Sequence, residues 1–531
     1  MTESPAPELP GQGAAPASLF FRVFPSLMLP MFLGVVDQTI VATALPAISG
    51  SLGDVERISW IVVAYLITNT VAAPVYGRLG DVLGRRRMMF VALGVMIAAS
   101  AFCAAATSIL MLTFARVLQG IGGGGMQPLA QSILLESFPP HQHGTAMAVY
   151  GMGIVVAPVI GPTLGGWITD SYSWRWIFYI NLPVGFLALF MANLFIEDPP
   201  YLRQKFLGAI DYLGFGLMAV WLGTLQLVLD KGQEADWFAT GWIRWTVAAS
   251  VIALAGFILR EFMSREPIVQ LRILADRNFA VGTLIAGLYG FVLYGMTALL
   301  PLFLQTLLGY PALDSGLAVS PRGIGSIVSM LMVGVLVNYV DGRILLACGF
   351  GILGYSTFLL SRVNLDISMA SVVVPNLMNG FAGGFIFVPL TTMAMGRLRK
   401  QQIGNAAGIY NLMRNIGGSV GIASVTTLLV RGAQVHQSYL AGNLTAGNPA
   451  TAGALQGLEA KFRIAGASGA TAHAEALGAL YHSVQQQASV LAYADNFRLL
   501  AYLSLLCILP ILFFHRLKSR ARERKPVEDD R

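Results

Sequence analysis

The chain has 531 residues, of which 55% are hydrophobic and 11% are charged, and its formal net charge is +7. Soluble globular proteins average about 25% charged residues, so this composition predicts an integral membrane protein and excludes an ordinary soluble enzyme. The positive charge does not predict a nucleic-acid partner, because the Lys and Arg residues gather in short connections between apolar segments and not on one helix face.

Runs of about 20 predominantly apolar residues are long enough to cross a bilayer as helices. Fourteen such runs predict an all-α fold with fourteen transmembrane helices. In chain order they cover residues 23–46, 57–77, 87–106, 109–134, 144–168, 173–195, 208–229, 241–261, 279–303, 315–338, 343–361, 368–394, 404–430 and 498–514.

Basic residues predict the orientation of these helices. Arginines cluster in the second, eighth and twelfth connections and after the last helix, so the positive-inside rule makes those segments cytoplasmic. Both termini are then cytoplasmic as well. The connection 230–240, on the opposite side, agrees because it carries Asp230, Glu234 and Asp236 against only Lys231.

An internal repeat emerges when the chain is aligned with itself at an offset of 257 to 261 residues. RVLQGIGGGG, from Arg116, matches NLMNGFAGGF, from Asn376, and GTAMAVY matches GNAAGIY. Both copies have the same membrane orientation, as expected for halves related by an axis along the membrane normal. The repeat predicts two six-helix bundles with an inserted helix pair between them.

The predicted domains follow from this repeat. They are a cytoplasmic N-terminal tail (1–22), a first six-helix bundle (23–195), a linker with two extra transmembrane helices (196–278), a second six-helix bundle (279–514) that includes an outer loop (431–497), and a basic cytoplasmic tail (515–531).

The predicted first helix carries a carboxylate, Asp37, near its middle. A charged side chain at such a depth costs at least about 2.5 kcal/mol, so an intramembrane acid is by default a functional site. We interpret Asp37 as a protonatable coupling site, because protonation removes its charge and can shift a two-state equilibrium. The alternative is a structural hydrogen bond to a neighbouring helix.

Arg116, in the predicted fourth helix, must find a carboxylate, a carbonyl or water at its depth. We predict that its Coulomb attraction tunes the proton affinity of a nearby acid, which we take to be Asp37. The alternative is a buried arginine that ties helices together. The second repeat has no acid in place of Asp37, and Asn376 replaces Arg116, so coupling chemistry is expected in the first half and substrate surface in the second.

The second connection, GRLGDVLGRRR, predicts a cytoplasmic loop that latches one state. Glycines permit a tight turn, the acid can pair with an arginine or a helix N-terminus, and the arginines are expected to stay in the cytosol. The predicted latch residues are Gly77, Asp81, Gly84, Arg85 and Arg86. A plain topology signal explains the arginines but not the spacing of the glycines and the acid.

The fifth helix carries a ridge of small residues with prolines between them. Small residues let another backbone approach closely, and prolines free carbonyls and bend a helix. We predict a moving contact at this ridge, although static packing is the alternative. Its members are Gly153, Ala157, Pro158, Gly161, Pro162 and Gly165.

Polar side chains on the fourth and thirteenth helices are candidates for lining a substrate cavity. They are Gln119, Gln127, Asn411, Arg414 and Asn415. The residues on the thirteenth helix could equally bridge neighbouring helices, and the sequence favours neither interpretation.

The outer loop 431–497 predicts an amphipathic helix over 474–497 that runs into the last transmembrane helix. Such a helix offers a face to a partner protein, whereas the alternative is a solvated loop that covers an outer vestibule. The loop histidines have no metal-ligand spacing, and the chain has no nucleotide loop and no nucleophile elbow. We therefore predict no catalytic residue, no metal and no cofactor.

GRLGDVLGRRR, LTFARVLQGIGGGG and GIVVAPVIGPTLGG resemble, in order, three stretches of the major facilitator superfamily. LGVVDQTIVATALPAI, WRWIFYINLPVG, fourteen helices and the long loop before the last helix resemble the EmrB-type drug:proton antiporters. The resemblance implies the major facilitator fold and multidrug efflux of hydrophobic or amphipathic compounds in exchange for protons, with Asp37 and Arg116 at the coupling positions.

For Gram-negative members the resemblance also implies the cell inner membrane, a periplasmic adaptor protein and an outer-membrane channel. The resemblance also implies that members preferring cations carry an extra acid in the later helices; this chain has no acid so placed, which disfavours dicationic substrates and favours neutral or acidic lipophiles. A transporter dedicated to a single metabolite, siderophore or fatty acid is the main alternative. A passive channel would not need the duplicated glycine-rich segments, and a membrane enzyme would need a catalytic constellation.

Overall fold

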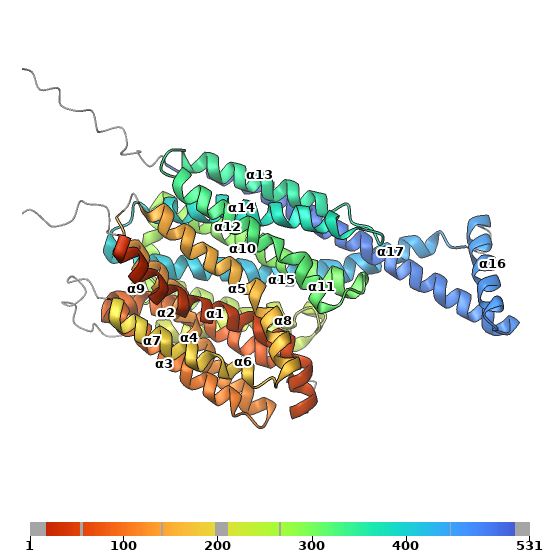
Figure 1. Ribbon diagram of the computed structural model, residues 1–531, viewed down its shortest axis with the longest axis horizontal. Helices are drawn as coiled ribbons and strands as arrows, with labels where there is room; N and C mark the ends of the chain where they lie inside the picture. Colours follow the sequence, from red (N-terminus) through yellow and green to blue (C-terminus); the bar gives the residue numbers. More distant parts are fainter. Residues whose placement is uncertain are drawn as a thin grey trace, which may run out of the picture.

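The computed structural model describes residues 17–53, 57–139, 142–196, 211–264, 267–445 and 448–515. Figure 1 shows a bundle of long, roughly parallel helices, with a helical arm that projects from one end. Thirteen described helical segments are long and apolar enough to cross a membrane, and α5, which bends by 42° between Pro158 and Thr163, raises the number to fourteen. The prediction of an all-α protein with fourteen membrane-spanning helices is confirmed.

The first half of the chain forms α1 (Ala17–Leu52), α2 (Trp60–Leu83), α3 (Arg85–Ala104), α4 (Ile109–Ser137), α5 (His143–Ser171), the short α6 (Trp176–Tyr179) and α7 (Asn181–Phe195). An inserted pair follows, with α8 (Tyr212–Lys231), η4 (Trp237–Ala239), α9 (Gly241–Met263) and η5 (Leu271–Ala275).

The second half begins with α10 (Arg277–Leu302), the π-helical turn η6 (Phe303–Leu307), α11 (Ala312–Val319), α12 (Pro321–Leu336), α13 (Gly342–Leu360) and α14 (Met369–Met395). It ends with η7 (Lys400–Gln402), α15 (Ile403–Gly442), α16 (Pro449–Ile464), α17 (Gly469–Leu506) and α18 (Ile508–Ile511).

Side-chain caps explain where several of these helices begin. Ser108 accepts a hydrogen bond from the backbone N–H of Met111 at the start of α4, and Asp276 does the same for Phe279 at the start of α10. These bonds satisfy N–H groups that have no partner inside the helix. Helices α14 and α17 begin in the same way, at Ser368 and Ser468.

The contacts between helices repeat in the two halves. In the first half α1 packs on α5 and α4 packs on α2 and α3, and in the second half α10 packs on α15 and α14 packs on α12 and α13. The halves meet through α2 against α15 and α5 against α12, which are equivalent pairs under the same relation. The inserted helices α8 and α9 pack on each other, and α8 also lies against α2.

Four sequence-based boundaries need correction. Helix α1 begins at Ala17, inside the predicted tail 1–22, and α2 continues to Leu83, so the predicted second loop is largely helical. The predicted outer loop 431–497 is also mostly helical, because α15 runs to Gly442 and α16 follows. The last spanning helix starts at Gly469 and not at residue 498. Residues 1–16, 197–210 and 516–531, which include most of the two predicted tails, lie outside the described part of the chain.

The helical arm consists of the end of α15, all of α16 and the first half of α17, and α16 forms its tip (Figure 1). Helix α17 is continuous from Gly469 to Leu506, so the prediction that the helix over 474–497 runs into the last transmembrane helix is confirmed. Gln437 of α15 donates to the Tyr481 hydroxyl of α17 at 3.2 Å, and His436 contacts Asp495 at 2.8 Å. These side-chain hydrogen bonds hold α15 and α17 side by side.

Candidate proton-coupling site

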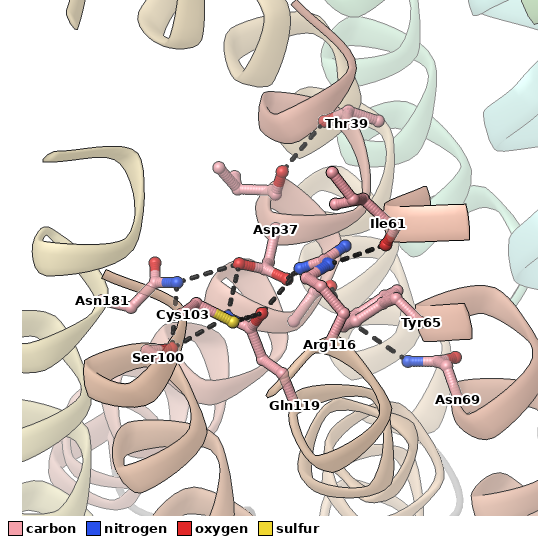
Figure 2. Close-up of polar contacts among 12 residues, drawn as sticks. Asp37, Thr39, Ile61, Tyr65, Asn69, Ser100, Cys103, Arg116, Gln119 and Asn181 are labelled. Carbon is pink, nitrogen blue, oxygen red and sulfur yellow. Dashed lines mark hydrogen bonds and ion pairs between the residues drawn. The ribbon is translucent and has the colours of Figure 1, made fainter. Parts of the chain in front are cut away.

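Asp37 of α1 and Arg116 of α4 form an ion pair inside the first bundle. The guanidinium Nη1 lies 2.5 Å from Asp37 Oδ2, and both side chains are fully buried (Figure 2). A buried arginine needs a counter-charge because desolvation of an unpaired ion costs several kcal/mol. The pairing that we predicted from the depth of the two residues is present.

Two amide side chains complete the hydrogen bonding of Asp37. Gln119 of α4 and Asn181 of α7 each donate to Asp37 Oδ1 at 2.9 Å, as Figure 2 shows. The Gln119 amide also donates to the Ser100 hydroxyl of α3 at 2.8 Å, and its oxygen accepts from Arg116 at 2.7 Å. Three donors therefore converge on Asp37, an arrangement that suits a carboxylate, which only accepts hydrogen bonds.

Arg116 is fixed by α2 as well as by Asp37. Its Nε donates to the backbone carbonyl of Ile61 at 3.2 Å, and its guanidinium lies 4.0 Å from the centre of the Tyr65 ring. The Tyr65 hydroxyl donates to the carbonyl of Gly34, one turn before Asp37. The Arg116 Nη2 atom is buried without an acceptor, so the guanidinium retains an unused donor.

The cluster joins five helices of one half: α1, α2, α3, α4 and α7 (Figure 2). Gln119, which we predicted to line a cavity, is fully buried in this cluster in the structure. Ser100, Asn181 and Tyr65 were missed from the sequence. The only signal for Asn181 was its place in the run WRWIFYINLPVG, which is part of the family resemblance. The resemblance did not imply a role for this residue.

The predicted latch residues Asp81 and Arg85 lie at the opposite end of α2, beside the second half. Asp81 accepts from Arg85 at 2.8 Å and from the backbone N–H of Asn405, at the start of α15, at 2.9 Å. A Cβ atom on Gly77 would lie 2.7 Å from the carbonyl of Gly404, so only glycine permits this approach. The two halves are therefore closed at the end of the bundle that carries the basic connections.

The prediction that Arg85 stays in solvent is wrong. It is 1% exposed and pairs with Glu136 of α4 as well as with Asp81, because α2 and α3 meet at a single residue, Gly84. The φ angle of Gly84 is 96°, a left-handed conformation that favours glycine. Arg86 is half-buried, and its guanidinium donates to the Asn193 side chain of α7 at 2.8 Å.

The small-residue ridge of α5 packs against α1, the helix that carries Asp37. A Cβ atom on Gly161 would lie 2.0 Å from Thr39 Oγ1, and one on Gly165 would lie 2.5 Å from Thr43 Oγ1. Gly153 faces the two methionines Met28 and Met31 in the same way. Ala157 is buried between these glycines, and the helix bends just after Pro158, while the Pro162 side chain is outside the described part. The predicted close contact is present.

Two of the polar residues predicted on the thirteenth helix connect the halves. Asn411 of α15 donates to Gln131 of α4 at 2.7 Å, and Arg414 donates to Gln127 at 2.6 Å. Asn415 is half-buried on the same helix. In this state Asn411 and Arg414 therefore bridge helices, which is one of the two interpretations that the sequence left open.

Known proteins similar to this chain identify its family. A family model described as the Major Facilitator Superfamily matches residues 27–422. The chain belongs to this superfamily. It is 35% identical over 424 residues to the fatty acid resistance protein FarB of Neisseria gonorrhoeae, and the aligned region covers 79% of this chain and 83% of FarB. It is 34% identical over 429 residues to the multidrug export protein EmrB of Haemophilus influenzae, covering 80% and 83% of the two chains.

The EmrB protein of Escherichia coli is 32% identical over 428 residues, with 80% of this chain and 83% of EmrB covered. The chain is thus an EmrB-like member of the superfamily. Solved structures agree on the fold: the human organic anion transporter MFSD10 matches with a TM-score of 0.61 at 15% identity, covering 92% of this chain and 99% of its own. The proton:xylose symporter XylE matches with a TM-score of 0.63 at 12% identity, covering 95% and 98%.

Proposed function

We propose that this protein is a multidrug efflux transporter that exports hydrophobic or amphipathic compounds by alternating access, in exchange for protons. The observation that carries the proposal is the fully buried Asp37, which accepts three hydrogen bonds inside an EmrB-like chain. The names of the EmrB relatives support the export of drugs. Membership of a transporter family gives no support to an enzymatic activity.

Protonation of Asp37 supplies the switching step in this proposal. A neutral carboxylic acid carries a hydrogen that must point at an acceptor, yet Arg116, Gln119 and Asn181 all present donors to Asp37. Proton binding therefore breaks at least one of these bonds and removes the counter-charge of Arg116. The protonated and ionised forms favour different packing of α1 against its neighbours, and a ligand that discriminates between two states shifts their populations.

The proposal places the protein in a bacterial inner membrane with both termini in the cytoplasm. The positive-inside rule supports this orientation, because the basic connections lie at the end of the bundle where Asp81 meets Asn405. The structure then represents a state that is closed toward the cytoplasm. The small lipophilic substrate is expected to bind between the halves from one side at a time.

A periplasmic adaptor and an outer-membrane channel belong to the proposal as partners. The helical arm, with α16 at its tip (Figure 1), supports an adaptor. Large apolar side chains along the arm are exposed. Val435, Tyr439 and Ile464 are 51%, 72% and 88% exposed. An exposed rigid surface of this kind suits docking by another protein.

A second candidate function is export dedicated to one class of compound, fatty acids. The similarity to a protein named for fatty acid resistance favours it. One experiment separates the two functions: the wild-type protein is expressed in a strain that lacks its own exporters, and resistance and accumulation are measured for dyes, uncouplers, antibiotics and fatty acids. Multidrug efflux predicts resistance to several chemical classes that is abolished by collapse of the proton gradient, and fatty acid resistance alone would favour the second function.

A further inference from the structure

Two arginines are buried in the second half with no role in the coupling site. Arg322 of α12 is 8% exposed, and Arg414 of α15 is 3% exposed. An isolated buried charge is unfavourable, so buried arginines are normally paired with a carboxylate. These two side chains make neutral contacts instead, Arg322 with the Thr297 hydroxyl at 2.9 Å and Arg414 with the Gln127 amide oxygen at 2.6 Å.

The second half has few acids that could neutralise them. Between residues 277 and 442 the sequence contains Asp314, Asp341 and Asp366, and all three are exposed near helix ends. None of these acids forms an ion pair with Arg322 or Arg414 in the part of the chain that the structure describes.

The buried acids elsewhere are already engaged or lie in other elements. Asp37 pairs with Arg116, and Asp81 and Glu136 pair with Arg85. Asp211 and Glu261 are buried at the inserted pair, where Asp211 pairs with Arg260 and Glu261 accepts from the backbone of Val269. The positive charge of Arg322 and Arg414 therefore has no counter-charge from the described residues.

Both arginines lie against the same helix, α10. Arg322 donates to Thr297 of this helix, and a Cβ atom on Gly290 of the same helix would lie 2.2 Å from the backbone carbonyl of Arg414. Arg414 also keeps a spare donor, since its Nε is buried without an acceptor. Donors without acceptors in a buried region are suited to a ligand that brings its own negative charge.

Apolar aromatic side chains from both halves adjoin these groups. Tyr150 of α5 donates to the carbonyl of Gln127, whose side chain holds Arg414, and its ring stacks on Phe387 of α14 at 6.1 Å. Gly380 of α14 packs on the backbone of Arg322, and the next residue, Phe381, packs on Phe385 with 5.2 Å between the ring centres. Gln127 and Tyr150 belong to the first half and Arg414 and Phe387 to the second, so this region lies between the halves.

We propose that Arg322 and Arg414 bind the anionic head group of an amphipathic substrate, and that the neighbouring aromatic side chains receive its apolar part. This inference rests on the proposed export function and narrows its substrate class to lipophilic anions such as carboxylates and sulfonates. A planar guanidinium binds both groups through paired donors. A lipophilic cation is disfavoured, because like charges repel strongly where water is scarce.

Binding of matched eight-carbon probes tests the inference. Octanesulfonate, 1-octanol and octyltrimethylammonium are titrated calorimetrically into the protein in lipid nanodiscs, and the heats from empty nanodiscs are subtracted. We expect the wild-type protein to bind octanesulfonate more tightly than either other probe. Arg322→Gln and Arg414→Gln should each weaken octanesulfonate binding about 10- to 100-fold, the range of one charge-assisted hydrogen bond, and leave octanol binding unchanged.

Charge-preserving and remote variants serve as controls. Arg322→Lys and Arg414→Lys should retain most of the octanesulfonate affinity, and Arg362→Gln, at an exposed arginine beside Phe358, should retain all of it. Equal loss of octanol and octanesulfonate binding in the Gln variants would mean that the arginines are structural and would overturn the inference. Absence of an anion preference in the wild-type protein would overturn it as well.

The proposed function fails in a different way. If cells that express the wild-type protein export no test compound, the export function itself is wrong. If they export neutral and cationic drugs in a proton-dependent manner, and the Gln variants do so at the wild-type rate with no change in anion export, the function stands and only the anion site is refuted.

Discussion

Replacement of Asp37 by Asn isolates the proton-binding role of this side chain. The amide has nearly the same size as the carboxylate, but it cannot bind and release a proton. It also presents one oxygen and one NH2 group where Asp37 presents two acceptors to Arg116, Gln119 and Asn181. In the Asn variant at least one of these three donors must face the new NH2 group, which is itself a donor. Arg116 also loses its only buried counter-charge among the described residues.

The size of this perturbation follows from the burial of the pair. Removal of one partner from a fully buried ion pair typically costs about 3–5 kcal/mol, because the remaining charge is left uncompensated. We therefore expect Asp37→Asn to lower the unfolding temperature measurably and to abolish proton-coupled export. Asp37→Glu, which keeps the charge but displaces it, should retain partial activity.

A double variant separates the electrostatic effect from the coupling effect. Asp37→Asn combined with Arg116→Gln removes both charges, so the unfolding temperature should recover relative to Asp37→Asn, while export stays lost. The assay uses proteoliposomes with a pH-sensitive dye inside and an imposed pH gradient, and substrate is added to start antiport. Substrate-dependent proton flux at the wild-type rate in Asp37→Asn would refute the assignment of Asp37 as the coupling site.

Three further changes test the α1–α5 contact, the latch residues and the helical arm. Gly161→Leu should reduce efflux far more than Leu164→Ala, because a Cβ on Gly161 already meets Thr39 at 2.0 Å whereas Leu164 is only half-buried; wild-type efflux by Gly161→Leu at equal expression would contradict a close contact. Arg85→Gln should destabilise the protein by about 3–5 kcal/mol, measured by thermal unfolding in detergent, whereas Arg87→Gln, at an exposed residue, should change stability by less than about 0.5 kcal/mol. Replacement of residues 443–468 by a short Gly-Ser linker removes α16 and should leave antiport in proteoliposomes intact but abolish cellular resistance that depends on an adaptor. Loss of both activities would show that the arm serves the transporter itself.

Much of the fold could be predicted because the bilayer restricts what the sequence can do. Long apolar runs must form helices that satisfy their own backbone hydrogen bonds, so the fourteen spans were visible from hydropathy alone. The same reasoning predicted that Asp37 and Arg116 need partners, because each is too expensive to bury alone. Their pairing follows from charge, although they are separated by 79 residues in the chain.

Other parts of the site depend on how the helices are placed against one another. Ser100 and Asn181 are neutral residues in apolar runs, and nothing local distinguishes an amide that reaches Asp37 from one that bonds its own helix. The burial of Arg85 was missed because the positive-inside rule treats a terminal arginine as solvated. Only the continuation of α2 to Leu83, with a single glycine before α3, brings Arg85 between Asp81 and Glu136.

The arrangement of α1 and α5 offers a route from the coupling site to the interface between the halves. Gly161 of α5 contacts Thr39 of α1, two residues from Asp37, so α1 cannot shift without moving against α5. Helix α5 in turn packs on α12 of the second half, the helix that carries Arg322. The bend of α5, between Pro158 and Thr163, includes Gly161, which meets Thr39, and the part of α5 before the bend reaches Gly144, which meets Gly334. A packed contact has few intermediate arrangements. A charge change at Asp37 would therefore act on the α5–α12 contact through α1, and an anion bound at Arg322 would act on the same contact through α12.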